Sequence, residues 1–298
     1  MIRLRPVKVN NKKLFHEIAK KKQFRNPHCQ TCEEPQDDCG SCLHGNRGKM
    51  LSLEAYVFGR YDFYEAHTND LNAIQPEHTL NEESAKLIRD SYEHSTAFQD
   101  TRKKIFDAMP PEMQGKCPFC MISEPTTLEH YFPESVYPEY ILYAPNLVPC
   151  CSHCNELKGT SVFDDHHTRR IIHFYFDDLP EETFLKAAIR IEDGIPIVQF
   201  TLEFAHPSQM TRIVQNHFEA LQLQKRYQRQ VAGELSTLCR EIREYTQNGL
   251  PMEMVRTILR ARMNSFRRTH GENYWKASLY EALLEEDEAQ LQQMVQSA

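Results

Sequence analysis

The chain has 298 residues, of which 40% are hydrophobic and 26% are charged, and its formal net charge is −7 at pH 7. This composition is typical of a globular protein, and it excludes a fibrous chain and a strongly basic protein that coats nucleic acid. No run approaches the roughly 18 apolar residues of a membrane helix, and no apolar signal-peptide segment follows Met1. We therefore expect a cytoplasmic protein with no membrane contact.

Basic residues are concentrated at the start of the chain. The first 25 positions hold nine lysines and arginines against one acidic residue, Glu17, whereas the rest of the chain is acidic overall. A basic segment on an acidic body predicts an anionic partner, and a solvated helix face is the alternative. We expect a short strand over residues 1–10 and a basic helix over residues 11–25.

Four cysteines follow this helix at close spacing. They form two Cys-x-x-Cys pairs separated by six polar residues: Cys29, Cys32, Cys39 and Cys42. Disulfides are rare in a reducing cytoplasm, so such pairs indicate a metal site. We expect a zinc knuckle here, while an iron–sulfur cluster, a redox switch and free thiols are the alternatives.

The remaining predicted elements divide the whole chain into three units. Residues 81–108 are expected to form a helix, and Pro110–Pro111 then breaks the pattern. Residues 171–176 are expected to form a buried strand and residues 185–204 a hairpin. The chain from 207 onward is expected to be helical. The predicted units are therefore 1–108, 109–205 and 206–298.

A second set of cysteines lies in the middle unit. Two further Cys-x-x-Cys pairs, well separated in the sequence, form it: Cys117, Cys120, Cys151 and Cys154. Zinc takes four thiolates in a closed tetrahedron, so this spacing predicts a structural zinc site that clamps a small module. Cys150 could replace Cys151 through a shift of one residue. A redox dithiol and unrelated core cysteines are the alternatives to zinc.

Polar residues between and after these cysteine pairs suggest the chemistry of the module. Glu129 precedes His130, Asn146 follows in the next segment, and Asn155 lies just after the last cysteine. In this order and spacing, residues 117–160 resemble the HNH endonucleases, also called ββα-metal nucleases. Many members of that family have histidine at the last position, so this chain resembles the HNN variant.

The resemblance implies a role for each of these residues. His130 would be the general base that deprotonates water, for which a neutral imidazole is suited. Asn146 would hold the loop and orient the histidine. Glu129, where the family usually has aspartate, and Asn155 would bind Mg²⁺ or Mn²⁺ through oxygen. Lys158, one turn beyond Asn155, would contact phosphate, and an exposed helix lysine is the alternative.

The resulting prediction is an α+β protein. It combines a zinc-clamped ββα-metal module, an N-terminal zinc knuckle and a mainly helical C-terminal region, with one or two zinc ions. The expected function is hydrolysis of DNA phosphodiester bonds. The longer sequence motif over residues 129–139 resembles the HNH components of Septu-type and retron-linked antiphage systems. Those components act with an ATPase, so the resemblance implies an ATPase partner. An RNA- or tRNA-cleaving nuclease and a non-catalytic zinc-binding scaffold are the alternatives.

Overall fold

The computed structural model describes residues 2–22, 45–192 and 195–297. Its α-helices are α1 (Asn11–Lys21), α2 (Asn46–Ser52), α3 (Glu54–Ala66), α4 (Glu82–His94), α5 (Thr96–Asp107), α6 (Ser152–Lys158), α7 (Gln209–Ala220), α8 (Leu223–Gln247), α9 (Met252–His270), α10 (Trp275–Glu285) and α11 (Glu288–Ser297). Short 3-10 helices are η1 (Leu71–Ala73), η2 (Pro111–Met113), η3 (Pro138–Tyr140) and η4 (Ala144–Asn146). The strands are β1 (Thr127–His130), β2 (Leu147–Cys150), β3 (Leu185–Glu192) and β4 (Ile195–Leu202).

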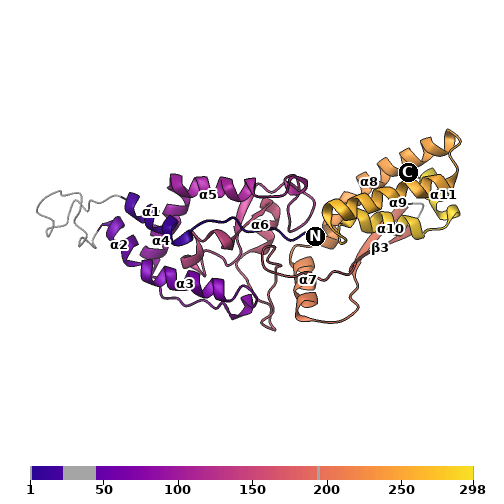
Figure 1. The fold of residues 1–298 in the computed structure, drawn as a ribbon. Helices are drawn as coiled ribbons and strands as arrows, with labels where there is room; N and C mark the ends of the chain where they lie inside the picture. The colour runs from indigo at the N-terminus through magenta and orange to yellow at the C-terminus, as the bar shows by residue number, and fades with distance from the viewer. Residues whose placement is uncertain (1, 23–44, 193–194, 298) are drawn as a thin grey trace, which may run out of the picture.

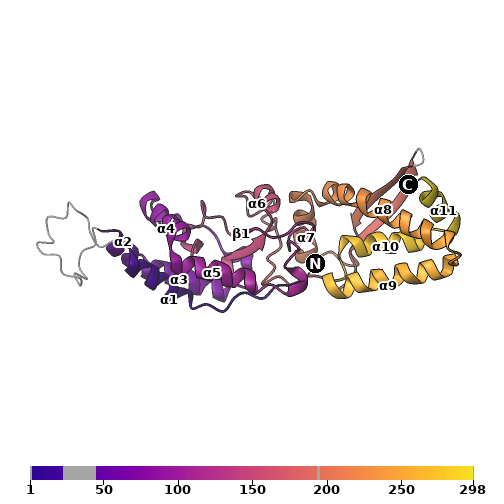
Figure 2. The ribbon, with the colours of Figure 1, turned by 90° about the horizontal axis from the view of Figure 1, so that it is seen from above.

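The molecule is elongated (Figure 1). Helices α1 to α6 and the β1–β2 sheet lie toward one end, and helices α8 to α11 with the β3–β4 sheet lie at the other, with α7 between them (Figure 2). The predicted α+β class is confirmed at this level, as a mostly helical chain with two small antiparallel sheets. None of the helices in the described ranges is both long and apolar enough to cross a lipid bilayer.

The basic helix is amphipathic. In α1, Leu14, Phe15 and Ile18 are buried, whereas Lys20 and Lys21 are exposed at its C-terminal end. The side chain of Asn10 caps the helix by accepting a hydrogen bond from the backbone of the third residue. Lysines in the last turn also complement the negative end of the helix dipole. Lys13, Lys20 and Lys21 therefore lie on the exposed face of a packed helix.

The predicted helix over residues 81–108 is divided in two. Ser95 has an extended backbone and ends α4, while its side-chain oxygen accepts a hydrogen bond from the Phe98 amide and caps α5. Serine favours such a cap because its hydroxyl competes for backbone groups that a continuous helix would use. The break lets α4 and α5 pack against each other. Together they form one wall beside the first sheet, because α5 also packs on β2.

The first sheet consists of two short antiparallel strands. Thr127 pairs with Cys150 at one end of the register, and His130 pairs with Leu147 at the other. Helix α6 starts two residues after β2 and packs on β1. The order strand, strand, helix therefore brings the residues at the end of β1 and those on α6 into one small unit.

Two predicted strands are not formed. Residues 2–10 and 171–176 are not strands, because their backbone groups bond to each other and to side chains instead. The Leu4 amide donates to the Phe174 carbonyl at 2.8 Å. The His173 amide donates to a carboxylate oxygen of Asp177 at 2.7 Å. The second segment is buried as expected, but it forms a turn that the N-terminal segment runs along.

The predicted hairpin over residues 185–204 is confirmed as β3 and β4. Helix α10 packs on β3, and helix α8 packs on β4. The Asn273 side-chain oxygen also accepts hydrogen bonds from the amides of Phe184 and Leu185, at 2.7 and 2.9 Å. The hairpin therefore packs with the C-terminal helices rather than with the middle unit, to which the sequence-based boundary at 205 assigned it.

A buried arginine joins α3 to the loop between β1 and β2. Arg60 is 5% exposed, and its Nε donates to Glu139 Oε1 at 3.0 Å. Its two terminal nitrogens donate to Glu77 Oε1 at 2.6 Å and to the Gln75 carbonyl at 2.9 Å. Glu139 is itself 2% exposed and lies in η3. This network fixes the part of the loop directly before Ile141.

We expect Arg60→Met to destabilise the fold by about 3–5 kcal/mol, because it leaves the carboxylate of Glu139 buried without its cation. The free energy of unfolding measured in urea checks this value. Lys12→Met is the matched control, since Lys12 pairs with Asp62 at the surface and such pairs contribute about 1 kcal/mol or less. Equal effects of the two substitutions would contradict a structural role for the buried pair.

Candidate functional site

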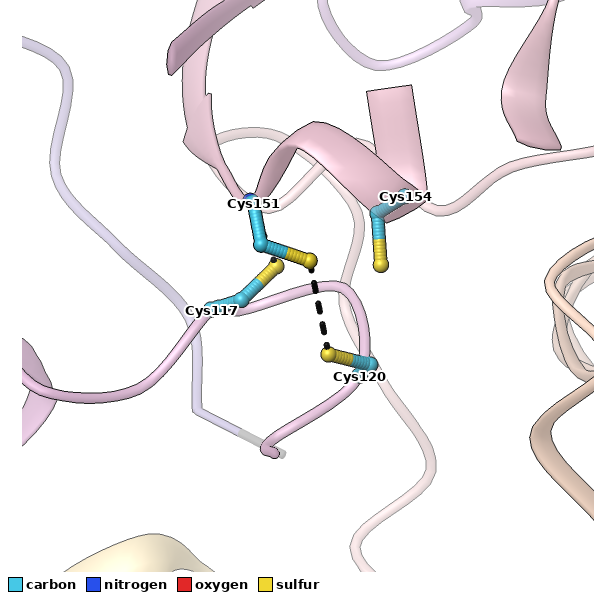
Figure 3. Close-up of side chains that lie close together, drawn as sticks. All are labelled: Cys117, Cys120, Cys151 and Cys154. Carbon is cyan, nitrogen blue, oxygen red and sulfur yellow. Dashed lines mark hydrogen bonds between the residues drawn. The ribbon is translucent and has the colours of Figure 1, made fainter. Parts of the chain in front are cut away.

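Four cysteine side chains converge where the loop of residues 117–120 meets the start of α6 (Figure 3). All four are buried, and their sulfur atoms lie within 4.8 Å of one another. The Cys120 and Cys151 sulfurs are 3.9 Å apart. A tetrahedral zinc with Zn–S bonds of about 2.3 Å places its sulfurs about 3.8 Å apart. Cys117, Cys120, Cys151 and Cys154 thus come together as predicted and fit a metal such as zinc.

Cys150 does not belong to this cluster. Its thiol lies 3.3 Å from the Cys151 carbonyl and 3.5 Å from Thr127 Oγ1. Burial raises the pKa of Cys150 to about 12, so the thiol stays protonated at neutral pH. The Cys150 sulfur is also not among the four cysteine sulfurs that lie within 4.8 Å of one another. Of the two candidates left open by the sequence, Cys151 is therefore the one whose position fits the metal site.

Arg226, from α8, lies against the cysteine cluster. Its Nη1 is 3.2 Å from Cys154 Sγ and 3.3 Å from the Leu221 carbonyl, and its Nη2 is 3.9 Å from Cys151 Sγ. Four thiolates carry more negative charge than one divalent ion neutralises, and a buried excess charge is costly without a nearby cation. Arg226 supplies that cation and links α8 to α6. No sequence signal indicated this contact, which joins segments far apart in the chain.

We expect Cys151→Ser to lose bound zinc and to destabilise the protein, because structural zinc binding contributes directly to folding free energy. Cys150→Ser is the matched control and should keep one equivalent of zinc at this site. Zinc content measured by inductively coupled plasma mass spectrometry, with the thermal midpoint, checks both. The reverse pattern would show that Cys150 is the ligand.

We expect Arg226→Met to keep zinc but to hold it less firmly. Loss of a hydrogen bond to a charged sulfur should lower the free energy of unfolding by about 1.5–3 kcal/mol. A chelator should also remove zinc from this variant at a higher rate than from the wild-type protein. The exposed Arg229 on the same helix provides the control Arg229→Met. Equal zinc-release rates in the two variants would refute the role of Arg226.

His130 ends β1 and is 8% exposed. Its Nε2 lies 3.1 Å from the Ile141 carbonyl oxygen. Because a carbonyl oxygen only accepts, Nε2 carries the ring proton and Nδ1 carries the lone pair. Burial lowers the pKa of His130 to about 4, so the ring is neutral at pH 7. The site therefore presents a neutral imidazole in one fixed tautomer, with Nδ1 facing Glu134 Oε2 at 3.9 Å.

Asn146 joins the two ends of the loop between the strands. Its side-chain oxygen accepts from the Phe132 amide at 2.8 Å, and its Nδ2 donates to the Phe132 carbonyl at 3.1 Å. Its own carbonyl accepts from the Tyr131 amide at 2.8 Å. Asn146 is fully buried, so these bonds are not exchanged with water. They fix the backbone directly after His130.

Glu129 and Lys158 form a buried ion pair, with Nζ and Oε1 2.7 Å apart. Lys158 also donates to the His130 carbonyl at 3.0 Å. Burial raises the pKa of Glu129, and the lysine opposes that shift. The alternative of an exposed helix lysine is wrong, because Lys158 is 3% exposed, and the phosphate contact stays a prediction. The lysine secures the end of β1 to α6.

Asn155, in the middle of α6, is half-buried, and no hydrogen bond of its side chain to the described part of the chain is found. Its amide oxygen and the carboxylate of Glu129 are donors that Mg²⁺ or Mn²⁺ accepts. One oxygen of that carboxylate binds Lys158, however. Among residues 2–22, 45–192 and 195–297, the four cysteines are the one group of three or more His, Cys, Asp or Glu side chains at metal-binding distances. The catalytic metal therefore stays a prediction.

The structure adds neighbours of His130 that the sequence did not indicate. The ring centroids of Tyr92 and His130 lie 4.8 Å apart. The guanidinium carbon of Arg102 lies 4.9 Å from the centroid of the Tyr92 ring. Both come from the wall formed by α4 and α5. No motif indicated them, because both lie outside the segment that carries the cysteine pairs and the nuclease-like motif. The other predicted zinc ligands, Cys29, Cys32, Cys39 and Cys42, lie outside the described residues.

Comparisons with known proteins give one relative and no family. No family model matches the chain, and no solved structure matches it. The chain is 25% identical over 197 residues to the protein named Ea31 of Escherichia phage lambda. The match covers 61% of this chain and 65% of Ea31, just under two thirds of that relative. The name of the relative states no activity. The similarity therefore indicates a relationship between the two proteins but no function for this chain.

Proposed function

We propose that this protein is a metal-dependent endonuclease of the HNH type, which hydrolyses phosphodiester bonds in nucleic acid. The observation that carries the proposal is the state of His130. Its Nε2 proton is committed to the Ile141 carbonyl, which leaves the lone pair on Nδ1 to accept a proton. An imidazole held in this tautomer can take a proton from an attacking water.

The surroundings of His130 support the same role. Asn146 holds the backbone after the histidine, and the pair of Glu129 and Lys158 holds the backbone before it. A general base must be positioned to within a fraction of an ångström, so buried supporting contacts are expected around it. The order β1, β2, α6 agrees with the ββα-metal module that the resemblance implies. Proton transfer to a base placed in this way contributes about 10²- to 10⁴-fold to a rate.

A divalent cation at Glu129 and Asn155 is part of the proposal. When bound, Mg²⁺ or Mn²⁺ stabilises charge on the phosphate and on the leaving oxygen. The donor chemistry supports this assignment, since both side chains offer oxygen atoms. The zinc cluster has a separate role, because four cysteines leave no open position for a substrate.

The resemblance supports DNA as the substrate, and RNA, including tRNA, is the alternative. Contacts to the phosphate backbone are shared by both, so the cleavage assay must decide. An antiphage role with an ATPase partner also rests on the resemblance. A zinc-binding scaffold without activity is the remaining alternative, and it predicts no cleavage of any substrate.

We expect His130→Ala to abolish cleavage, with a loss of at least about 10²-fold, while zinc content and circular dichroism stay unchanged. Purified protein is incubated with supercoiled plasmid, linear DNA and total RNA, with Mg²⁺, Mn²⁺ or EDTA. His153→Ala is the matched control, because His153 is an exposed histidine on α6. Cleavage retained in His130→Ala would refute the assignment of the base. Absence of cleavage with every substrate, also when co-purifying proteins are retained, would favour the scaffold.

A further inference from the structure

One wall of the site comes from helices outside the module. Tyr92 on α4 packs its ring against the ring of His130, with centroids 4.8 Å apart and planes inclined by 53°. The guanidinium carbon of Arg102 on α5 lies 4.9 Å from the centroid of the Tyr92 ring. Arg102 is half-buried. Tyr92 therefore contacts both the ring of His130 and the guanidinium of Arg102.

Unlike the other cations near His130, Arg102 has no carboxylate partner in the described part of the chain. Lys158 is committed to Glu129. Arg89 lies 3.6 Å from Glu134 and 4.0 Å from Glu82. For Arg102, in contrast, no carboxylate within ion-pair distance is found in the described part of the chain, and its guanidinium lies over the tyrosine ring instead.

The positive charge of Arg102 affects the pKa values of His130 and Tyr92. Its charge contributes to the lowering of the pKa of His130, after burial and together with Lys158. Its charge also opposes the rise that burial causes in the pKa of Tyr92. A cation in this position raises the local affinity for anions.

We propose that Arg102 is the phosphate-binding residue of the site, and that Tyr92 orients it. This inference rests on the proposed function, because it names the group that holds the nucleic-acid backbone beside His130. A guanidinium offers several N–H donors in a plane and binds two phosphate oxygens at once. Stacking on Tyr92 fixes that plane before the substrate arrives, so less conformational freedom is lost on binding.

Arg102 thereby takes the role that the sequence assigned to Lys158. The lysine is buried and neutralises a carboxylate, so it lacks a free charge for phosphate. Arg102 has the charge, the partial exposure and a stacked position near the base. Residues of the N-terminal helices and residues of the middle unit would together form the nucleic-acid site.

The test measures binding of the full-length protein to fluorescently labelled duplex DNA, single-stranded DNA and RNA by anisotropy. Divalent cation is not added, and a gel confirms that each oligonucleotide stays intact. Arg102→Gln is compared with Arg102→Lys and with Lys103→Gln, which removes an exposed charge from the same helix. Zinc content and circular dichroism confirm that each variant is folded.

We expect Arg102→Gln to weaken binding about tenfold or more. The slope of log K against log salt should become shallower by about 0.9 for a duplex or about 0.7 for a single strand, which corresponds to one lost phosphate contact. Arg102→Lys should restore the slope while recovering only part of the affinity. Tyr92→Leu should weaken binding without changing the slope, because it removes the orientation and keeps the charge.

Two outcomes overturn the inference in different ways. Wild-type affinity and slope in Arg102→Gln, or an equal loss in Lys103→Gln, would remove Arg102 from the site and leave the proposed nuclease intact. Failure of the wild-type chain to bind any of the three nucleic acids would overturn this inference together with the proposed function.

Discussion

Four buried sulfur atoms hold together parts of the chain that are distant in sequence. A loop provides two of them, and the start of α6 provides the other two. Helix α8 joins them through Arg226, whose guanidinium lies 3.2 Å from Cys154. A metal at such a site contributes its binding free energy to folding. The position of α6, and of everything that contacts α6, therefore depends on this cluster.

The chemistry of the site follows from that position. Lys158 at the end of α6 reaches both Glu129 and the carbonyl of His130. The end of β1 is therefore fixed by a helix that the cysteines hold in place. From the other side, Arg60 fixes the loop that brings the Ile141 carbonyl to the histidine ring. The cysteine cluster, Lys158 and Arg60 together position the end of β1 and the carbonyl that selects one tautomer of His130.

Buried charge explains where expectation and structure differ. A lysine one turn beyond a candidate metal ligand looks like a surface group, since lysine is rarely buried unless it is paired. The sequence could not show that Glu129 would be its partner, because the two residues lie far apart in the chain, one in a strand and one in a helix. The strand predicted over residues 171–176 was wrong for a related reason. Its apolar residues are buried, yet the carboxylate of Asp177 takes the His173 amide that a strand partner would have used.

The sequence by itself determined the members of the cysteine cluster except for one ambiguity, the α+β class, the β3–β4 hairpin and most helices. These features depend on local spacing: two residues between thiolates, alternating apolar residues in a hairpin, and helix caps such as Asn81 at the start of α4. Only the tertiary structure decided whether Cys150 or Cys151 joins the cysteine cluster. It also decided that Lys158 is buried, that Arg226 lies beside the cysteines and that Arg102 lies over the ring of Tyr92. Those outcomes depend on burial and on charge pairs between distant segments. A single sequence contains no periodicity that records such contacts.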